Sequence, residues 1–409
     1  VLAFENYDDH NRAGRYSARD MAVNYLESCD QNAILFTYGD NDTFPLWYAQ
    51  EVEGIRTDVR VINLSLLGTD WYINQMREKK YNSEPVEMVL PAEKYRQGSR
   101  DVVIIMNQLS EFVELKDLIK FVGSESDQAK IKASDNSAYS FFPTKNIKIK
   151  IDSTEVANAG FLNKNELAKM DTAIMWEVSQ NYFSKSDLAV YDILASNNWK
   201  RPIYFASSSA PDTYLGLTDY FRLEGFAYRF VPIKSEKIAD EVYGYIDTER
   251  MYKNVVEKFG WGNLGGQKTF VDYQNFRVLN IMSAREMYAQ LIIALASNNE
   301  IDKAWEVVEA LDKSLPIDKI PLDYNSLTII DALYSVGKTA LAKQYSETYA
   351  NTTREKLAYF KQIGRRFAPS VEYEKRNEQS ALKRLIELAV TYGELEFAEK
   401  LRINLMEEE

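Results

Sequence analysis

The first clear pattern along the chain is a strand, a helix and a second strand near the N-terminus. Ala33–Tyr38 (AILFTY) is a continuous apolar run, as expected of a strand that is buried on both faces. After an acidic turn, Pro45–Gly54 (PLWYAQEVEG) has proline near its start and glycine at its end, which is typical of a helix. Asp58–Leu67 (DVRVINLSLL) predicts a second strand. This order predicts a βαβ unit, in which the two strands are parallel and the crossover is right-handed.

Further strands and helices are predicted in the first two thirds of the chain. Asp101–Met106 (DVVIIM) and Arg201–Ala206 (RPIYFA) have the composition of buried strands. Asn146–Asp152 (NIKIKID) alternates isoleucine with lysine, which favours an edge strand because charge discourages unwanted pairing. Lys185–Asn198 and Asp212–Phe230 are predicted to be helices. Together these elements predict a three-layer α/β domain with a mostly parallel sheet.

From about residue 275 the pattern changes to one helix after another. Three segments resemble one another: Leu291–Leu311, Leu327–Tyr349 and Leu382–Leu405. In each, an apolar helix is followed by a turn residue and, five positions later, by a small alanine: Asn299 and Ala304, Gly337 and Ala342, Gly393 and Ala398. Small residues let antiparallel helices approach closely, as in tetratricopeptide-type repeats. We therefore predict an α/β domain over residues 1–270 and an all-α, tetratricopeptide-like helical-repeat domain over residues 271–409.

The net charge and the counts of cysteine and histidine exclude several kinds of partner and of catalytic or metal site. The formal net charge is −12, so neither nucleic acid nor an anionic membrane surface is expected as a partner. Cys29 is the only cysteine, which excludes an internal disulfide and a cysteine-based zinc site. His10 is the only histidine, so histidine-dependent catalytic triads are excluded unless His10 is itself the base.

The sequence carries no membrane span and no nucleotide-binding motif. No run reaches the roughly 18 apolar residues that are needed to cross a bilayer, and no signal peptide opens the chain. Because it begins Val-Leu-Ala-Phe without methionine, we expect it to be a piece of a longer protein. The phosphate-binding Walker loop, the GxGxxG fingerprint and the GxSxG elbow are absent. The sequence therefore predicts no catalytic residue, no metal ligand set and no cofactor.

Three polar loops are predicted to meet at the carboxyl edge of the sheet, where open α/β sheets bind ligands. They are Gly39–Thr43, Gly68–Tyr72 and Ser207–Tyr214. A hard cation or a polyhydroxyl ligand suits the carboxylates, hydroxyls and amide that they offer. The ligand-binding candidates are Asp40, Asn41, Asp42, Thr43, Asp70, Trp71, Ser207 and Asp212.

The motif Gly39-Asp40-Asn41-Asp42 has three interpretations. As a structural turn, it leads from the strand into the helix, with Asp42 or Thr43 capping the helix that Pro45 begins. As a binding site, it supplies ligands from the carboxyl edge. As a catalytic motif, its Asp-x-Asp shape is that of many metal- and nucleotide-sugar-dependent glycosyltransferases. The sequence alone favours the structural turn, because two carboxylates in a tripeptide form a weak motif.

Four segments resemble one known family. They are Asn6–Cys29, Asn32–Met76, Asn197–Ala206 (NNWKRPIYFA) and Tyr220–Ile233 (YFRLEGFAYRFVPI). The chain resembles the soluble C-terminal region of large bacterial membrane proteins in a protein-O-mannosyltransferase-like family of unknown function. That family is related to an animal transmembrane O-mannosyltransferase that also carries C-terminal tetratricopeptide-type repeats. The similarity extends over nearly the whole chain, and the long block Asn32–Met76 makes it specific.

The resemblance implies a role for the chain without assigning a catalytic residue. In the family, a multi-spanning N-terminal region resembles C-type glycosyltransferases, uses lipid-linked sugar donors and would carry the catalytic acid; that region is not part of this sequence. The resemblance implies a non-catalytic module at the periplasmic face of the inner membrane, tethered through its N-terminus, which binds or positions an acceptor protein or peptide. Two alternatives stay open: a self-contained metal-dependent enzyme that uses Asp40, Asn41 and Asp42, and a protein-interaction scaffold unrelated to sugar transfer.

Overall fold

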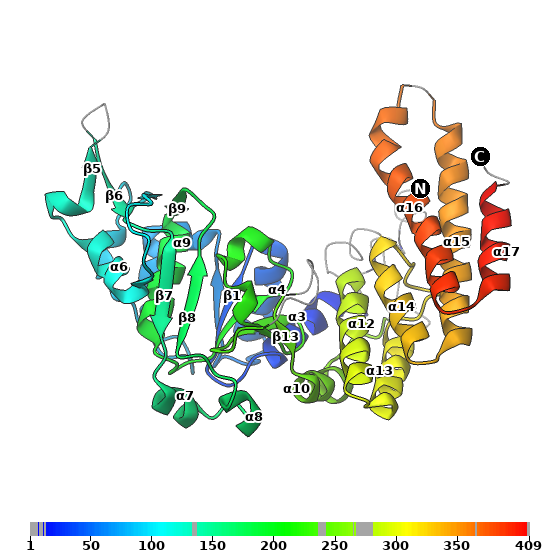
Figure 1. Cartoon of the computed structure of the whole chain (residues 1–409), viewed down its shortest axis with the longest axis horizontal. Coiled ribbons are helices and arrows are strands. Elements are labelled where there is room, and N and C mark those ends of the chain that lie inside the picture. The colour runs from blue at the N-terminus through cyan, green and yellow to red at the C-terminus, as the bar shows by residue number, and fades with distance from the viewer. Residues whose placement is uncertain are drawn as a thin grey trace. The chain divides into compact units, whose positions relative to one another are not determined.

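The chain divides into two compact units. The computed structural model describes residues 7, 11, 14–132, 137–235, 243–264, 266, 281–364 and 366–406. One unit is Ala22–Asp247, and the other contains the chain from Thr248 onward together with the described residues before Ala22 (Figure 1). His10, and the predicted domain limit at residue 270, lie outside the described residues. The first unit is a mixed α/β region and the second is helical, as the sequence predicted.

The main sheet of the α/β unit has six strands. Strand β1 lies between β2 and β10 and is parallel to both, so that Ile34 lies opposite Arg60 on one side and Ile203 on the other. This confirms the predicted parallel pair around helix α4 (Asp40–Glu51). The strands are β1 (Ile34–Thr37), β2 (Arg60–Asn63), β10 (Ile203–Ala206), β11 (Phe221–Leu223), β12 (Ala227–Phe230) and β13 (Tyr245–Ile246), in the spatial order β13-β11-β12-β10-β1-β2.

The sheet is mixed, which corrects the expectation of a mostly parallel one. Strand β12 is antiparallel to both β10 and β11. The helix predicted over Asp212–Phe230 is also wrong, because this segment forms two short 3-10 turns and then the β11–β12 hairpin. Only three residues join the two strands, with Gly225 at φ 134°, and so short a connection can link antiparallel neighbours only.

Two smaller sheets complete the α/β unit. The first contains β3, which the sequence predicted as a strand, and the second has β7 in its middle. The prediction of an edge strand for β7 is therefore wrong: β4 pairs on one side and β8 on the other. The strands, in spatial order, are β5 (Lys130–Lys132), β6 (Ala138–Phe142), β3 (Val102–Ile105) and β9 (Tyr182–Ser184), then β4 (Val113–Glu114), β7 (Asn146–Lys150) and β8 (Ala173–Glu177).

The α/β unit also contains seven described α-helices, of which α9 is the longest. Helix α9 confirms the prediction for Lys185–Asn198, and a capping box formed by Ser184 and Asp187 fixes its start. Its long buried face includes Leu188, Tyr191 and Ile193. The helices are α3 (Ser17–Glu27, which runs across the division between the units), α4, α5 (Asp70–Met76), α6 (Leu115–Gly123), α7 (Ser153–Ala159), α8 (Lys164–Leu167) and α9 (Lys185–Asn197).

The second unit consists of helical hairpins, as predicted. Helices α12 and α13, α14 and α15, and α16 and α17 pack as consecutive pairs. The turns occur at Asn299, Gly337 and Gly393, with φ values of 61°, 75° and 79°. The three alanines, Ala304, Ala342 and Ala398, are buried. The helices are α10 (Thr248–Tyr252), α12 (Ile281–Ser297), α13 (Ile301–Ser314), α14 (Leu327–Ser335), α15 (Thr339–Gln362), α16 (Ala368–Thr391) and α17 (Leu395–Met406).

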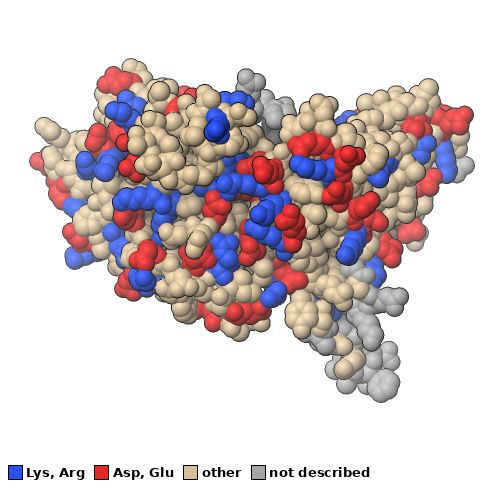
Figure 2. All heavy atoms as spheres, turned by 90° about the horizontal axis from the view of Figure 1, so that it is seen from below, with Lys and Arg blue, Asp and Glu red and all other residues tan. Residues whose placement is uncertain are grey.

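Two observations concern the surface charge and the possibility of a membrane-spanning helix. On the face shown in Figure 2, acidic and basic side chains are interspersed, and neither sign forms one continuous area. Among the described helices, none combines the length and the apolar character required to cross a membrane.

Candidate functional site

The carboxyl ends of the three parallel strands define the candidate site. Strands β2, β1 and β10 are adjacent and point the same way, so the residues that follow Asn63, Thr37 and Ala206 emerge at one edge of the sheet. In open α/β sheets this edge is where ligands bind. The three loops that the sequence selected therefore start from the same side of the main sheet.

The acidic motif is the first turn of helix α4, and not a loop before it. The helix begins at Asp40, with Gly39 as the preceding residue at φ 84° and ψ −178°, a conformation that favours glycine. Pro45 lies inside the helix, so it does not begin it. Neither Asp42 nor Thr43 is the N-cap. Asp40 and Asn41 are exposed, and the helix dipole favours carboxylates in this first turn.

Asp42 joins the loop after β1 to the loop after β10. The Ser208 hydroxyl donates a hydrogen bond of 2.7 Å to Asp42 Oδ2, although the two residues are 166 positions apart. Burial raises the pKa of the Asp42 carboxyl, and hydrogen bonds from Ser208 and from the Tyr38 backbone offset part of that rise. Asp42 is thus a partly buried carboxylate held at the carboxyl edge by a serine, and Ser208 is a residue that the sequence prediction missed.

Thr43 lies beneath this pair, in the interior. It is fully buried, and its hydroxyl donates to the Gly39 carbonyl at 2.7 Å. The same oxygen lies 2.8 Å from Thr37 Oγ1 and accepts a bond of 2.9 Å from Asn63 Nδ2. Three neighbours therefore saturate the hydroxyl, which ties β1, α4 and β2 together. The position makes Thr43 a support for Asp42 rather than a group that faces a ligand.

Asp70 and Trp71 begin helix α5 after the second parallel strand. The two carboxylate oxygens of Asp70 accept hydrogen bonds from the backbone N–H of Trp71 (2.8 Å) and of Gln97 (3.3 Å). Asp70 thus fixes the start of the helix and holds the segment around Gln97. Trp71 is 55% exposed, so its indole is available to a ligand.

The loop after β10 supplies the remaining predicted residues. Ser207 is held by its backbone, since its N–H donates to the Phe226 carbonyl and its own carbonyl accepts from the Tyr214 hydroxyl. Asp212 is exposed in a 3-10 turn (Pro211–Tyr214). The structure brings Asp212 close to a carboxylate that the sequence prediction missed, Asp187. Burial raises the pKa of Asp187, hydrogen bonds from Ser184 partly offset this, and the Asp212 charge adds to the rise.

An aromatic row lies next to this edge, and of its members the sequence prediction named only Trp71. We use this name for Phe44, Trp47, Tyr72 and Trp71, on helices α4 and α5. Phe44 stacks on Trp47 with ring centroids 5.5 Å apart, Trp47 lies 6.5 Å from Tyr72, and Tyr72 lies 5.5 Å from Trp71. Phe44 and Trp71, at the two ends of the row, are 49% and 55% exposed. Aromatic side chains that neighbouring rings hold in place, by stacking at Phe44 and by an edge contact at Trp71, can bind apolar side chains or sugar rings at low entropic cost.

The set at the carboxyl edge is therefore suited to binding. It contains exposed carboxylates, the partly buried Asp42–Ser208 pair and the aromatic row. Among the residues that the structure describes, no group of three or more His, Cys, Asp or Glu side chains is arranged to hold a metal ion. The chemistry that these groups offer is hydrogen bonding by carboxylates and hydroxyls beside an aromatic surface.

Comparisons with known proteins agree with this division of the chain. The fold defines a mixed α/β domain that is followed by helical hairpins. Residues 18–250 match the model of the TMEM260-associated domain 2, and the match covers more than half of the chain and nearly the same residues as the α/β unit. The chain belongs to this family, which is linked to TMEM260, a protein O-mannosyltransferase-like protein. No curated protein and no solved structure matches the chain.

Proposed function

We propose that this chain is a non-catalytic, extracytoplasmic module of a membrane-bound protein of the C-type glycosyltransferase kind, and that it binds and positions the acceptor protein. In this proposal it is the soluble C-terminal region of a bacterial protein-O-mannosyltransferase-like protein, at the periplasmic face of the inner membrane. The link of its family to TMEM260 supports the connection with protein O-glycosylation. The membrane is reached through a preceding N-terminal region.

The observation that carries the proposal is the aromatic row at the ligand-binding edge of the sheet. Exposed, preordered aromatic side chains are enriched at the centres of protein interfaces, because they bury large areas with few rotatable bonds. Phe44 and Trp71 present such area to solvent, and Asp40 and Asp42 lie in the same helix turn beside it. An acceptor polypeptide would place apolar side chains on the row and donate hydrogen bonds to the carboxylates.

The helical hairpins are a second surface on which an acceptor polypeptide could bind in this proposal. We propose that they act as tetratricopeptide-like repeats, which bind extended peptides or support a neighbouring domain. The left-handed turns and the buried alanines support the repeat interpretation. Binding at the carboxyl edge does not depend on this part of the proposal.

Peptide binding to the whole chain tests the acceptor role. The probe is an array of synthetic peptides that contain serine and threonine, followed by calorimetry on those retained. We expect a subset to bind, and we expect Phe44→Ala with Trp71→Ala to weaken that binding roughly tenfold or more. The matched control is Tyr182→Ala, which removes a 60% exposed aromatic side chain from strand β9 of the α/β unit, outside the aromatic row. An array without binders, or equal binding by the double variant, would contradict the proposal.

A further inference from the structure

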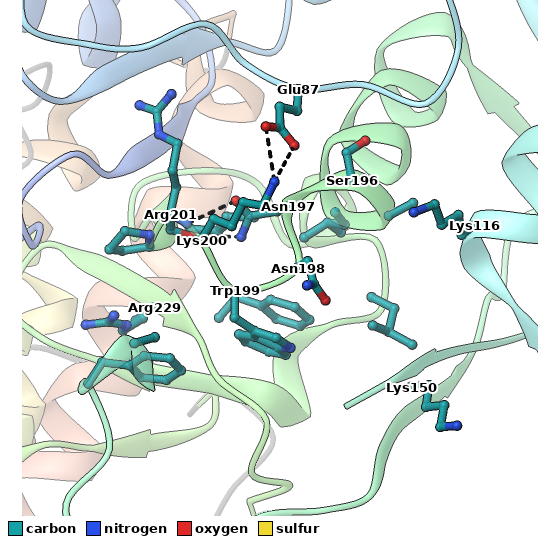
Figure 3. A pocket seen from close by; sticks show the side chains of 18 of the residues that line it. Glu87, Lys116, Lys150, Ser196, Asn197, Asn198, Trp199, Lys200, Arg201 and Arg229 are labelled. Carbon is teal, nitrogen blue, oxygen red and sulfur yellow. Dashed lines mark hydrogen bonds and ion pairs between the residues drawn. The ribbon is translucent and has the colours of Figure 1, made fainter. Parts of the chain in front are cut away.

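A cavity of about 420 Å³ opens at the edge of the main sheet opposite the candidate site. It lies at the start of β10, where Ile203 and the preceding loop form one wall, and at the end of the antiparallel β12, where Arg229 and Phe230 form another. Helix α6 and strand β7 contribute Lys116 and Lys150 (Figure 3). Its volume falls within the range of small-ligand pockets. We call it the amino-edge cavity.

Basic groups exceed acidic groups around the amino-edge cavity, in a chain whose net charge is negative. Its basic side chains are Lys116, Lys150, Lys200, Arg201 and Arg229, and its acidic side chains are Glu87 and Glu114. The Lys200 ammonium is paired with Glu87 at 3.1 Å. Arg229, which is buried, forms ion pairs with Asp30 and Glu224 behind the cavity wall. Within the described part of the chain, no hydrogen bond or ion pair is found for the exposed Lys116 side chain.

Arg201 is a buried residue of the cavity wall, and within the described residues its guanidinium bonds to neutral groups. Its guanidinium donates hydrogen bonds to the carbonyls of Asn32 (2.9 Å) and Glu84 (2.8 Å) and to Ser83 Oγ (3.0 Å). Burial and the neighbouring Arg60 lower the pKa of Arg201 to about 10. The charges of Glu84 and Asp58 offset part of that lowering. Figure 3 shows this guanidinium turned away from Lys116 and Lys150, so the lysines and not Arg201 would contact an anion in the cavity.

The loop that forms the cavity wall has an unusual backbone. Asn198 and Trp199 follow one another with φ values of 43° and 62°, and a bulky residue such as tryptophan rarely adopts this left-handed conformation. Stacking holds Trp199 in place, with its ring centroid 5.6 Å from Phe230 and 6.0 Å from Phe161. In Figure 3 the Asn198 amide lies between Trp199 and the two lysines, Lys116 and Lys150. The loop thus places a hydrogen-bonding amide next to the side of the cavity that holds both lysines and Glu114, whose carboxylate accepts a hydrogen bond from the Lys150 backbone N–H at 3.1 Å.

We propose that the amino-edge cavity binds a small organic anion, a carboxylate or a phosphate monoester carried on a body about the size of one sugar ring. Lys116 and Lys150 contact the anionic group, and Asn198 bonds to polar substituents of the ring. The edge of Trp199 borders the ring itself. This site is distinct from the carboxyl edge and does not depend on the acceptor-binding role proposed above.

The test uses the whole chain with three probes: galacturonate, glucose 6-phosphate and, as the neutral comparison, glucose. Each is titrated by calorimetry and by thermal unfolding, up to a concentration of about 10 mM, where a millimolar ligand raises the melting temperature measurably. We expect at least one anionic probe to bind and to raise the melting temperature, and we expect glucose to do neither. Binding should weaken at higher salt, since the contact with the lysines is electrostatic.

Three variants locate the site. Lys116→Ala with Lys150→Ala should weaken anion binding roughly tenfold or more. Lys120→Ala, which removes an exposed lysine from the same helix but outside the cavity, should leave it unchanged. Asn198→Asp should abolish binding, because it adds a negative charge while aspartate still tolerates the left-handed conformation.

Several results would overturn the proposal. They are the absence of binding by both anionic probes, equal binding of glucose, and anion binding that survives the double lysine variant. A short glutamate-rich peptide is included as a fourth probe. If it binds in this cavity while both small anions fail to bind, the site is a docking point for acidic protein segments and the small-ligand proposal is wrong. Phe44→Ala with Trp71→Ala should leave anion binding intact, so failure here and failure of the acceptor role can be told apart.

Discussion

At the scale of single residues, Asp42 is a carboxylate whose surroundings disfavour its charge. Burial raises its pKa above the value of about 3.9 expected in the unfolded chain. Between these two pKa values the folded protein holds more protons than the unfolded chain, so stability falls as the pH rises through that window. Asp42→Asn cannot titrate, yet its amide oxygen can still accept the Ser208 hydrogen bond.

We therefore expect the stability of Asp42→Asn, relative to the unsubstituted chain, to increase as the pH is raised from about 4 to 7. Urea unfolding at a series of pH values measures this difference. Asp40→Asn, at an exposed position in the same helix turn, is the matched control and should not reproduce the trend. A stability difference for Asp42→Asn that stays constant over the whole range would contradict the buried-carboxylate interpretation.

Glu224 is the central carboxylate of a buried ion-pair network that includes Arg222 and Arg229. Arg222 and Arg229 lie directly opposite each other on β11 and β12, and all three side chains are buried. Glu224 Oε1 accepts from Arg222 Nη2 at 2.5 Å and lies 3.9 Å from Arg229 Nη1. Glu166 and Asp30 complete the pairing of the two arginines. Glu224 is the carboxylate that lies near both arginines, so without its charge the two buried like charges would be offset only by Glu166, Asp247 and Asp30 among the described residues.

Glu224→Gln should lower the free energy of unfolding by about 3–5 kcal/mol, because it removes one partner of a buried ion pair. Equilibrium unfolding in urea, followed by circular dichroism, gives the value. Glu87→Gln removes the partner of Lys200 in a pair whose side chains are about 60% exposed, and it should change stability by no more than about 0.5 kcal/mol. Equal effects of the two substitutions would show that Glu224 has no special role.

At the scale of elements, the helical hairpins depend on left-handed turn residues. Asn299, Gly337 and Gly393 occupy the equivalent turn position in their hairpins. A Cβ atom built at Gly337 would meet nothing within 4 Å, so any cost of a substitution comes from the backbone conformation and not from a clash. A substitution at Gly337 therefore measures the cost of the left-handed backbone without a contribution from packing.

We expect Gly337→Ala to lower the free energy of unfolding by about 1–2 kcal/mol, the cost of the left-handed conformation for a residue with a Cβ. Gly337→Asn should cost less, because asparagine occupies the same position at Asn299. Gly364→Ala is the matched control: its Cβ also meets nothing within 4 Å, and its φ is not left-handed, so its effect should stay within about 0.5 kcal/mol. Thermal and urea unfolding of the three variants give the order. An alanine at position 337 that is no worse than one at position 364 would contradict this account.

At the scale of the whole molecule, the proposed function predicts that the chain transfers no sugar. Catalysis requires preordered groups around a reacting centre, and the proposal assigns that centre to another region of the parent protein. The assay incubates the chain with labelled nucleotide and lipid-linked donors, divalent metal and acceptor proteins, and we expect no labelled product. Divalent metals should also leave the melting temperature unchanged.

The same assay distinguishes the alternative function. Sugar transfer that disappears in Asp40→Asn or Asp42→Asn would show that the chain is a metal-dependent enzyme that uses the first turn of helix α4. A metal-dependent rise in melting temperature that is lost in Asp40→Asn would establish a cation site there. Transfer that survives both substitutions would place the reacting centre elsewhere in the chain.

Local patterns were enough to predict the elements whose conformation is decided by neighbouring residues. The apolar runs predicted β1, β2, β3 and β10, and the turn residues predicted all three helical hairpins. In these segments, the periodicity of apolar positions and a left-handed turn residue fix the conformation within a few residues of the chain. The candidate loops at the carboxyl edge followed from the same information, since the ends of parallel strands meet at one edge.

Strand pairing, buried ion pairs and sites built from residues far apart in the sequence were decided by the tertiary structure. Strand β7 is a middle strand because β4 and β8 pair with it, which its own alternation of lysine and isoleucine could not reveal. The β11–β12 hairpin replaces a predicted helix because buried ion pairs with Asp30 and Glu166 satisfy its arginines. The Asp42–Ser208 pair joins residues 166 positions apart, and the basic wall of the amino-edge cavity gathers lysines and arginines from separate elements. Such sites form only when long-range packing has fixed which side chains become neighbours, because burial and pairing are properties of the folded chain and not of any one segment.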